Sequence, residues 1–337
     1  MSEVVLSIVV AAFNVEKFIG RCVSSIGNAP LDGRVEILVI DDGSTDGTGE
    51  ILRDLVARSE DLRVIHQPNG GLGAARNLGL EQARGDYVWF LDGDDFLSPG
   101  SVASILEVLV EKAPDVLVTD FSCADEDGMP IGWIRSPFTQ DAGRVMHGGA
   151  FFARHFATTY AWLYVIKRSL LVEHNLRFQP RINMQDAELI PRVLARADSV
   201  HVSGIDSYVY VKRADSFINS TNPATRERYF DSVLEVRQRL EAFRQDVTDK
   251  DMLVGLDAKL GSIRRILLMA FVYDTLDGAS LRRRLDALKA DGLHPFDPLP
   301  DETRKERLVR NAVNACPALF PPPYRWVRTA TRGLRAR

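Results

Sequence analysis

An acidic turn ends an apolar run in the stretch "YVWFLDGDDFLSP" (87–99). Asp92, Asp94 and Asp95 fall within four positions, where their charges repel one another and the adjoining core edge makes their desolvation costly. Mg²⁺ and Mn²⁺ take carboxylate oxygens, often together with substrate phosphates. The spacing therefore predicts a divalent metal held mainly by Asp94 with help from Asp92, and Gly93 gives the backbone room to turn.

The same stretch also contains signals for the start of a helix. Ser98 suits an N-cap and Pro99 suits the first helical position, which predicts a helix over 100–112. This structural role leaves the three aspartates unexplained, so it does not remove the metal hypothesis.

A second acidic turn, "DDGSTDGT" (41–48), follows another apolar run. Asp46 or Thr45 can cap the next helix, so half of this motif has a structural explanation. Asp41 and Asp42 remain, and a carboxylate at this place could accept hydrogen bonds from a nucleobase or a ribose.

A helix opened by glycines is expected in "NGGLGAARNLG" (69–79). Gly71 and Gly73 resemble a dinucleotide-binding fingerprint, but Arg76 stands where a third glycine is needed and the motif follows the third strand, so NAD binding is a weak interpretation. Arg76 and Asn77 would lie in the first turns of this helix. A guanidinium there suits an anionic phosphate or a pyrimidine carbonyl.

The elements that position these turns alternate between strands and helices. Val- and Ile-rich strands alternating with amphipathic helices predict an α/β fold with a mostly parallel sheet covered on both faces, and ligands bind outside the carboxyl ends of such strands. The acidic and glycine-rich turns all lie at those ends, so they could line one crevice. The expected strands are 6–13, 35–40, 63–67, 87–91 and 115–121, and the expected helices are 16–27, 47–58, 72–84 and 101–112.

The rest of the chain has a different pattern. Residues 151–175 have a helical pattern, and the chain after about 222 is expected to be all-helical with apolar stripes. The length of 337 residues exceeds a usual single core, so two domains are predicted, 1–221 and 222–337, although one α/β core with a helical appendage also fits. The second is expected to serve self-association, giving a homo-oligomer, or acceptor binding.

Composition excludes several classes of protein. A net charge of −4 argues against a general nucleic-acid binder. Cys22, Cys123 and Cys316 are too widely spaced for a disulfide framework or a zinc site. The N-terminus lacks a basic signal-peptide region, and no apolar run reaches the roughly 18 residues of a membrane span. We therefore expect a cytoplasmic protein or one peripheral to the inner face of the cell membrane.

A basic tail ends the sequence, "PPPYRWVRTATRGLRAR" (321–337). On a helix its arginines would gather on one face, which predicts contact with an anionic membrane surface or an anionic polymer. A solvated, frayed terminus is the alternative.

Four of these motifs, in this order over about residues 5–220, resemble those of the family 2 glycosyltransferases with their GT-A fold: "SIVVAAFNVEKFIGRCVSSI", "EILVIDDGSTDGT", "NGGLGAARNLGL" and "DYVWFLDGDDFLSPG". The resemblance implies a nucleotide-sugar donor, a divalent metal at the aspartate motif and inversion at the anomeric carbon. It also implies that Ala11, Phe13, Asn14, Asp42 and Arg76 surround the nucleotide. Phe13 stands where the family often has tyrosine, so ring stacking is kept and a hydroxyl is lost.

The resemblance places the catalytic base in "RINMQDAELIPRVLARADSV" (181–200). Asp186 matches the aspartate of the family's Glu-Asp pair, and Gln185 replaces the glutamate. Asp186 is therefore the expected base and Glu188 the alternative. Both acidic residues could instead merely stabilise the start of a helix through its dipole.

Two further segments match the family. Arg213 and Ser216, in "YVYVKRADSFIN", correspond to the segment that closes over the donor diphosphate. Trp162 is the centre of "YAWLYVIKRSLL" (160–171), which implies acceptor contacts, and Tyr164 departs from a common lysine there.

Together these observations predict an inverting glycosyltransferase that depends on Mn²⁺ or Mg²⁺. It would move a hexosyl or N-acetylhexosaminyl group, most simply from a UDP-sugar, to a saccharide, polyol-phosphate or lipid-linked acceptor, in polysaccharide or teichoic-acid synthesis. A nucleotidyltransferase is one alternative, although "AAFNVEKF" stands where its basic, glycine-rich loop would follow the first strand. A non-catalytic nucleotide-sugar-binding scaffold protein is the other.

Overall fold

The computed structural model describes residues 4–27, 33–59, 61–132, 138–213, 220–274, 277–299 and 301–315. Ser216, Cys316 and the tail 321–337 lie outside the described residues, so the predictions made for them stay predictions. The chain forms two compact units. One comprises Met1–Ala214 with Ala242–Leu256, and the other comprises Asp215–Glu241 with Asp257–Arg337. The predicted division at 221/222 also stays a prediction.

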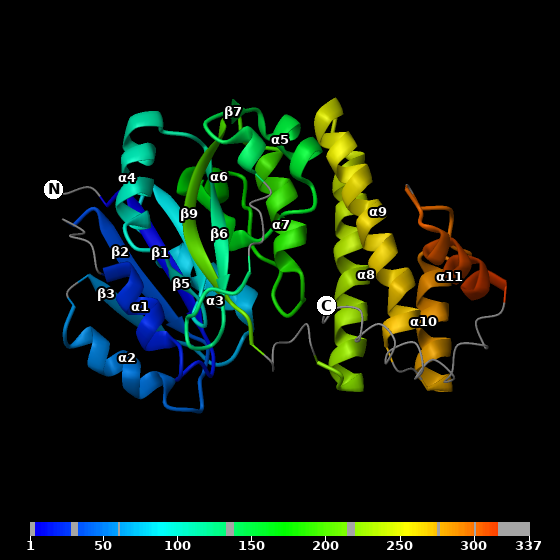
Figure 1. Ribbon diagram of the computed structural model, residues 1–337, viewed down its shortest axis with the longest axis horizontal. Coiled ribbons are helices and arrows are strands. Elements are labelled where there is room, and N and C mark those ends of the chain that lie inside the picture. Colours follow the sequence, from blue (N-terminus) through cyan, green and yellow to red (C-terminus); the bar gives the residue numbers. More distant parts are fainter. Residues whose placement is uncertain are drawn as a thin grey trace. The chain divides into compact units, whose positions relative to one another are not determined.

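The first unit is built on a nine-stranded sheet flanked by helices (Figure 1). Its strand order is β3-β2-β1-β4-β8-β6-β9-β5, and β7 pairs with β9. Strands β3, β2, β1 and β4 are parallel neighbours, and β6 also pairs in parallel with β9. The strands are β1 (Leu6–Ala12), β2 (Val35–Asp41), β3 (Leu62–His66), β4 (Tyr87–Asp92), β5 (Phe96–Leu97), β6 (Val116–Ala124), β7 (Val145–Met146), β8 (Tyr164–Lys167) and β9 (Val200–Val211).

The helices follow the predicted alternation, which confirms the α/β fold class. Helix α3 packs on β1 and β2, and α4 packs on β9. In the first unit the helices are α1 (Ile19–Gly27), α2 (Thr48–Val56), α3 (Leu72–Gln82), α4 (Ser101–Lys112), α5 (Gly148–His155), α6 (Arg168–Glu173) and α7 (Gln185–Leu194), with 3-10 turns η1 (Thr139–Asp141) and η2 (Ala161–Leu163). The chain continues through α8 (Pro223–Gln245), α9 (Lys250–Tyr273), α10 (Gly278–Ala290) and α11 (Arg304–Ala315).

Two local predictions were wrong. Residues 151–175 are not helical throughout, because β8 lies among them and pairs antiparallel with both β4 and β6. Helix α4 begins at Ser101, with Gly100 at the cap position in a left-handed conformation (φ 77°) and no side-chain cap. Ser98 therefore lies in the preceding turn, where its carbonyl accepts a hydrogen bond from the Ser101 amide.

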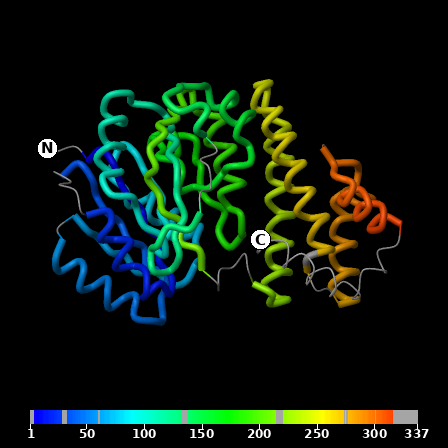
Figure 2. Tube along the Cα trace, in the orientation of Figure 1, coloured from blue at the N-terminus to red at the C-terminus, as the bar shows by residue number. Residues whose placement is uncertain are grey.

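Sheet pairing brings together segments that are distant in sequence. Strand β9 runs beside β6 with a register shift between Val118 and Asp120, and Figure 2 shows the two green segments side by side. The second half of β9 pairs with β5 and contacts the acidic turn described below.

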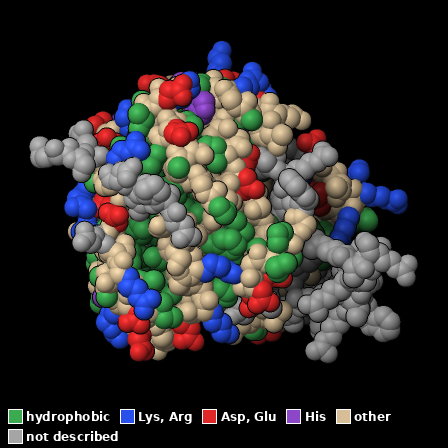
Figure 3. All heavy atoms as spheres, turned by 60° about the vertical axis from the view of Figure 1, so that its left-hand side comes forward, with side chains coloured by type: hydrophobic (Ala, Val, Ile, Leu, Met, Phe, Trp, Pro, Cys, Tyr) green, Lys and Arg blue, Asp and Glu red, His purple; other side chains and the backbone are tan. Residues whose placement is uncertain are grey.

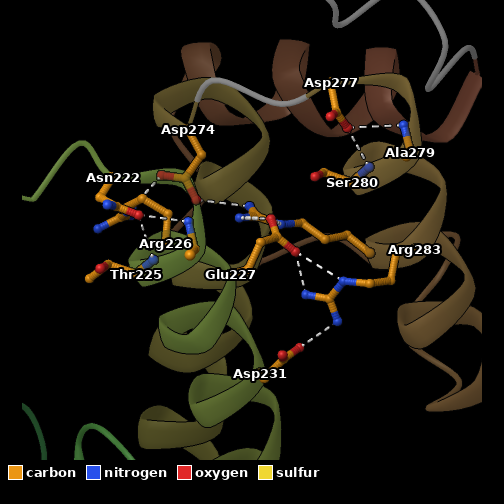
Figure 4. Close-up of polar contacts among 12 residues, drawn as sticks. Asn222, Thr225, Arg226, Glu227, Asp231, Asp274, Asp277, Ala279, Ser280 and Arg283 are labelled. Carbon is orange, nitrogen blue, oxygen red and sulfur yellow. Dashed lines mark hydrogen bonds and ion pairs between the residues drawn. The ribbon is translucent and has the colours of Figure 1, made fainter.

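The second unit contains a buried network of ion pairs. The Arg284 side chain is fully buried and pairs with Asp274 (2.8 Å) and Glu227 (2.6 Å). Arg226 Nε donates to Asp274 Oδ1 (2.7 Å), and Arg283 reaches Glu227 from the other side, as Figure 4 shows. Buried charges are tolerated only when they are paired in this way.

Three further observations concern the described residues. No helix among the described residues is long and apolar enough to cross a membrane. Cys22 and Cys123 are buried free thiols. On the face drawn in Figure 3, Lys and Arg side chains are interspersed with Asp and Glu.

Candidate active site

The register of three parallel strands aligns the predicted turns. Ala11 of β1 lies opposite Asp92 of β4, and Ala12 lies opposite Asp41 of β2. The Gly93 amide donates to the Ala11 carbonyl (2.9 Å), so the acidic turn starts directly beside the end of β1. The polar turns therefore leave the sheet at one level and at one edge, as predicted.

Arg76 joins two of the predicted carboxylates. Its Nη2 lies 2.7 Å from Asp92 Oδ1, and its Nη1 lies 2.8 Å from Asp186 Oδ1. The side chain is 1% exposed and lies over the Phe178 ring. Burial alone would lower the pKa of Arg76, but the charges and hydrogen bonds of Asp92 and Asp186 raise it above its ordinary value. A permanently charged fork thus fixes both carboxylates.

Asp186 is partly exposed, whereas Glu188 is buried. Asp186 lies in the first turn of α7, its side chain is 21% exposed, and its Oδ2 accepts a hydrogen bond from the Ala161 amide (3.1 Å). Glu188 is buried and its Oε1 pairs with Arg192 (3.0 Å). Of the two candidates for the base, only Asp186 is oriented towards the turn that carries Asp92.

Close packing of α3 against the start of α7 explains Gly73. A Cβ atom at Gly73 would lie 2.4 Å from Gln185 Oε1 and 2.8 Å from the Gln179 carbonyl oxygen. A side chain there would force Gln185 to move and would press on the backbone at Gln179, in the segment that leads into α7. Gly73 therefore acts on the site through backbone packing.

Asp94 and Asp95 have different environments. Asp94 Oδ2 lies 2.6 Å from Arg213 Nη2, and its side chain is 21% exposed. Burial and then the Asp92 charge raise the pKa of Asp94, and the Arg213 guanidinium opposes this. Asp94 thus presents a partly exposed carboxylate at the acidic turn, and the Arg213 guanidinium offsets its charge.

Asp95 is instead tied into the sheet. Its Oδ2 accepts a hydrogen bond from the Tyr208 hydroxyl (2.5 Å), and its Oδ1 accepts one from the Val211 amide (2.7 Å). Burial and the neighbouring charges of Asp94 and Asp92 raise the pKa of Asp95 well above its ordinary value. This residue anchors the acidic turn to β9.

The carboxylate oxygens at the acidic turn are the type of ligand that a hard divalent cation prefers. Asp92 and Asp94 offer partly exposed carboxylate oxygens, the ligand type that Mg²⁺ and Mn²⁺ take. Among the described residues no group of three or more His, Cys, Asp or Glu side chains is placed to hold an ion. Two carboxylates are enough only if substrate phosphates complete the coordination.

The Asp42 carboxylate holds the loop that precedes α3. It is buried, and its oxygens accept hydrogen bonds from Gln67 Nε2 (2.5 Å) and from the amides of Gly70 (2.8 Å) and Gly71 (2.8 Å). Because these contacts occupy both oxygens, Asp42 positions the loop that carries Arg76, and its predicted contact with the nucleotide stays a prediction.

Asp41 is also engaged. Its Oδ2 lies 2.8 Å from His66 Nδ1 and its Oδ1 accepts a hydrogen bond from the Ser44 amide (3.0 Å). Burial raises the pKa of Asp41, but the hydrogen bonds from Ser44 and His66 outweigh it and lower the pKa. His66 is a site neighbour that sequence reasoning missed.

Phe13 and Asn14 leave the end of β1. The Phe13 ring is 47% exposed, so one face is available for stacking. Asn14 has a positive φ (51°), and its Oδ1 accepts a hydrogen bond from the Thr45 amide (2.8 Å). Asn14 thus joins the first two strand-end loops.

Residues 7–163 match the family model "Glycosyl transferase family 2". This segment, a little under half of the chain, has the sequence of glycosyl transferase family 2. It is 32% identical over 218 residues to the uncharacterized glycosyltransferase EpsJ of Bacillus subtilis, covering 63% of this chain and 62% of EpsJ. It is 41% identical over 102 residues to a chondroitin synthase of Escherichia coli, covering 30% of this chain and 15% of that protein. The chain thus spans less than two thirds of the length of these relatives.

Solved structures show the same fold. TarS 1-349 of S. aureus, in complex with UDP-GlcNAc, has a TM-score of 0.65 at 18% identity and covers 98% of this chain and 92% of TarS. The mannosyltransferase PcManGT of Pyrobaculum calidifontis, in complex with GDP-Man and Mn²⁺, has a TM-score of 0.53 at 17% identity, covering 93% and 87%. The GT-A fold class expected from the sequence is confirmed.

Two residues predicted from the family 2 motifs have structural roles here. Asn77 donates from Nδ2 to the Phe178 carbonyl (2.8 Å) and accepts at Oδ1 from the Phe178 amide (2.9 Å), so it joins α3 to Phe178, and its predicted contact with the nucleotide stays a prediction. Tyr164 is fully buried, and its hydroxyl donates to the Thr158 carbonyl (2.5 Å). Tyr164 offers no surface to an acceptor, because the first residue of β8 faces the core.

Trp162 belongs to a stack of rings. It is 5% exposed and lies between Tyr160 (centroids 5.1 Å apart, 7° between planes) and Tyr208 (4.3 Å, 11°). Tyr160 is 49% exposed at the end of this stack. Tyr160 was not predicted. The sequence run "YAW" shows two aromatic residues, but it does not show which of the two rings is exposed.

Proposed function

We propose that the chain is an inverting, metal-dependent glycosyltransferase that transfers a sugar from a UDP-sugar to a hydroxyl group of an acceptor. The observation that carries this proposal is the Arg76 fork, which places Asp186 and Asp92 on one buried guanidinium. The UDP-GlcNAc in TarS supports a UDP-sugar donor, and the Mn²⁺ in PcManGT supports a divalent metal. Similarity to a chondroitin synthase favours a saccharide acceptor.

Asp186 would act as the general base. As the acceptor oxygen attacks the anomeric carbon, its proton moves to Asp186, and the bond between that carbon and the diphosphate oxygen breaks with its electron pair going to the diphosphate. A single displacement inverts the configuration and needs one base, unlike the carboxylate pair of a retaining hydrolase. Arg76 and the Ala161 amide hold the Asp186 carboxylate by different oxygens, so its orientation is set before the acceptor binds.

The leaving diphosphate requires positive charge. Arg213, which now pairs with Asp94, lies at the crevice and can turn to the diphosphate once Asp94 is otherwise engaged. Asp94 and Asp92 would hold the Mn²⁺ or Mg²⁺, which when bound stabilises the charge that develops on the leaving group. The ring of Phe13 would stack on the nucleobase.

A thermal-shift screen tests the donor proposal. UDP-, GDP-, CDP- and dTDP-sugars are compared with and without Mn²⁺, because a ligand that binds only the native state raises stability. We expect the largest rise with a UDP-sugar and Mn²⁺, followed by hydrolysis of that donor with inversion, read by ¹H NMR of the released sugar. No stabilisation by any of the four would contradict the proposal.

Two further assays discriminate the alternatives. A nucleotidyltransferase would release pyrophosphate from a nucleoside triphosphate and a sugar phosphate. A non-catalytic scaffold protein would be stabilised by a nucleotide-sugar without hydrolysing it, and the Asp186→Asn variant would then behave like the wild type.

We also propose self-association through the C-terminal helices, and the apolar stripes in the sequence after about residue 222 are its only support. Because the sheet-containing unit includes Ala242–Leu256, cutting the chain near 221 would remove part of that unit. Light scattering on the full chain is therefore the appropriate test, and a monomer at all concentrations would contradict it. Co-sedimentation with anionic liposomes tests the proposed peripheral membrane contact.

A further inference from the structure

Tyr160 ends a rigid column of aromatic rings. The rings of Tyr160, Trp162 and Tyr208 stack nearly parallel, with successive planes 7° and 11° apart. Phe121 packs edge-on against Trp162 (4.9 Å, 77°), which blocks lateral movement of the column. A ring held in this way loses little freedom when a ligand covers its outer face, so binding there has a small entropic cost.

The inner end of the column is tied to the acidic turn. The Tyr208 hydroxyl donates to Asp95 Oδ2 (2.5 Å) and accepts a hydrogen bond from the Asp92 amide (3.3 Å). The Trp162 carbonyl accepts from Trp89 Nε1 of β4 (2.8 Å). The position of the Tyr160 ring is thus fixed relative to the strand that carries the donor-binding aspartates.

The outer end lies beside the proposed base. The residue after Tyr160, Ala161, donates its amide to Asp186 Oδ2 (3.1 Å). Burial and then the Asp186 charge raise the pKa of Tyr160, which reflects the same proximity. The acceptor hydroxyl has to contact Asp186, so the body of the acceptor has to lie against its surroundings, and the half-exposed Tyr160 ring offers an apolar surface there.

Resting on the function proposed above, we propose that Tyr160 is the stacking platform for a pyranose ring of the acceptor, so that the acceptor ends in a cyclic saccharide. A pyranose presents a flat face of C–H groups, and the negative face of an aromatic ring attracts such groups. An open-chain polyol phosphate has no fixed flat face, and its only strongly attractive groups are phosphates, which a neutral phenol ring does not recognise. Of the acceptor classes that the sequence left open, the Tyr160 platform therefore favours one that ends in a saccharide over a polyol phosphate.

Saturation-transfer NMR on the full chain, saturated with UDP and Mn²⁺, tests this directly. The probes are methyl β-glucopyranoside, methyl β-galactopyranoside and methyl N-acetyl-β-glucosaminide, compared with glycerol 3-phosphate and ribitol 5-phosphate at equal concentration. We expect transfer to the ring C–H protons of at least one pyranoside, and much less to either polyol phosphate.

Variants at Tyr160 separate stacking from general apolar contact. Tyr160→Phe keeps the ring and should retain the signal, whereas Tyr160→Ala and Tyr160→Leu should weaken pyranoside binding about fivefold to tenfold, as expected for one stacking contact. Tyr160→Leu keeps most of the apolar volume, so it remains informative if the alanine variant folds poorly. Val110→Ala, an exposed apolar truncation on α4, is the matched control and should bind like the wild type.

Two results would overturn the proposal: equal pyranoside binding in the wild type, Tyr160→Ala and Tyr160→Leu, or stronger transfer to a polyol phosphate than to every pyranoside in the wild type. The rise in melting temperature with UDP and Mn²⁺, measured on the same samples, reports on the donor site alone. Failure of that rise would count against the proposed function, while loss of pyranoside contacts with the rise intact would count against Tyr160.

Discussion

Arg76 Nη1 donates to Asp186 Oδ1 across 2.8 Å, although the two residues are 110 positions apart in the chain. The other terminal nitrogen of the same side chain pairs with Asp92 (2.7 Å). The residue expected to receive the acceptor proton and a residue expected to bind the donor are therefore held by one buried group.

Replacing Asp186 by Asn should slow sugar transfer by about 10²–10⁴-fold, the usual contribution of a general base. The amide has similar size and can still accept a hydrogen bond, so donor affinity should survive. Initial rates of UDP release with acceptor and the thermal shift with UDP measure the two effects. Asp198→Asn is the control, because this side chain is 94% exposed. Transfer near the wild-type rate would show that the base lies elsewhere.

Arg76→Lys should lower kcat/KM by at least about tenfold, because an ammonium group cannot bridge two carboxylates with the fixed geometry of a guanidinium. If Arg76 acts by orienting Asp186, the effects of Arg76→Lys and Asp186→Asn should not add in the double variant. A double-mutant cycle on kcat/KM measures this coupling, and strict additivity would argue that Arg76 serves only the donor side.

Alanine substitutions at Asp94 and Asp95 should differ in their effects on metal dependence and on folding stability. Asp94→Ala should abolish the Mn²⁺ dependence of donor stabilisation and leave the folding stability close to that of the wild type. Asp95→Ala should cost roughly 1–3 kcal/mol of folding stability, because it leaves the Tyr208 hydroxyl and the Val211 amide without their buried partner. Urea denaturation and metal-dependent thermal shifts on both variants separate the two roles. If only Asp95→Ala lost the metal dependence, Asp95 would be the metal ligand and the assignment to Asp94 would be wrong.

Arg284→Ala should destabilise the second unit by roughly 3–5 kcal/mol, since removing one partner of a buried ion pair leaves uncompensated charge on Asp274 and Glu227. The exposed neighbour Arg282 provides the matched control, and Arg282→Ala should fall within about 0.5 kcal/mol of the wild type. Equal denaturation midpoints for the two variants would show that the network contributes nothing.

Asp141 should give the protein an acid-dependent loss of stability. Burial would raise its pKa, but hydrogen bonds from His155, Arg154 and Arg144 outweigh this and lower the pKa below its ordinary value near 3.8. The unfolded chain therefore binds the proton more readily, so this contribution is complete above about pH 4 and is lost as the pH falls through the folded pKa.

Asp141→Asn should remove that contribution. The difference in unfolding free energy between the wild type and Asp141→Asn should be constant from pH 5 to pH 7 and shrink below about pH 4. Urea titrations over this range measure it, with the exposed Asp54→Asn as the control. A difference that persists unchanged at pH 3 would show that the contribution of Asp141 is not ionic.

Local pattern was enough to predict the parallel part of the fold. The strands β1, β2 and β4 are rich in Val, Ile and other apolar residues because both faces of a parallel sheet are covered, and such runs are visible without any partner. Strand β8 has only the four residues Tyr164–Lys167, within an apolar stretch that a helix would tolerate equally well. Its strand conformation comes from pairing with β4 and β6, which local pattern does not contain.

The site was predictable in its location but not in the division of roles. Asp94 and Asp95 are adjacent and chemically identical, and what separates them is Tyr208, which is 113 positions from Asp95. Likewise nothing near Asp42 in the sequence reveals that Gly70 and Gly71 occupy its oxygens. The assignment of roles to identical residues depends on such distant partners.

The placement of β8 between β4 and β6 has a consequence for synthesis on the ribosome. Strands β1 to β4 are complete once residue 92 has emerged, and β4 then has a bare edge until Tyr164–Lys167 follow it. At about 5–20 residues per second this wait lasts several seconds. An unpaired, apolar strand edge is a template for wrong pairing. We therefore expect the nascent chain to need protection by a chaperone during this interval, although in the finished sheet β8 pairs with Tyr87–Trp89 of that edge.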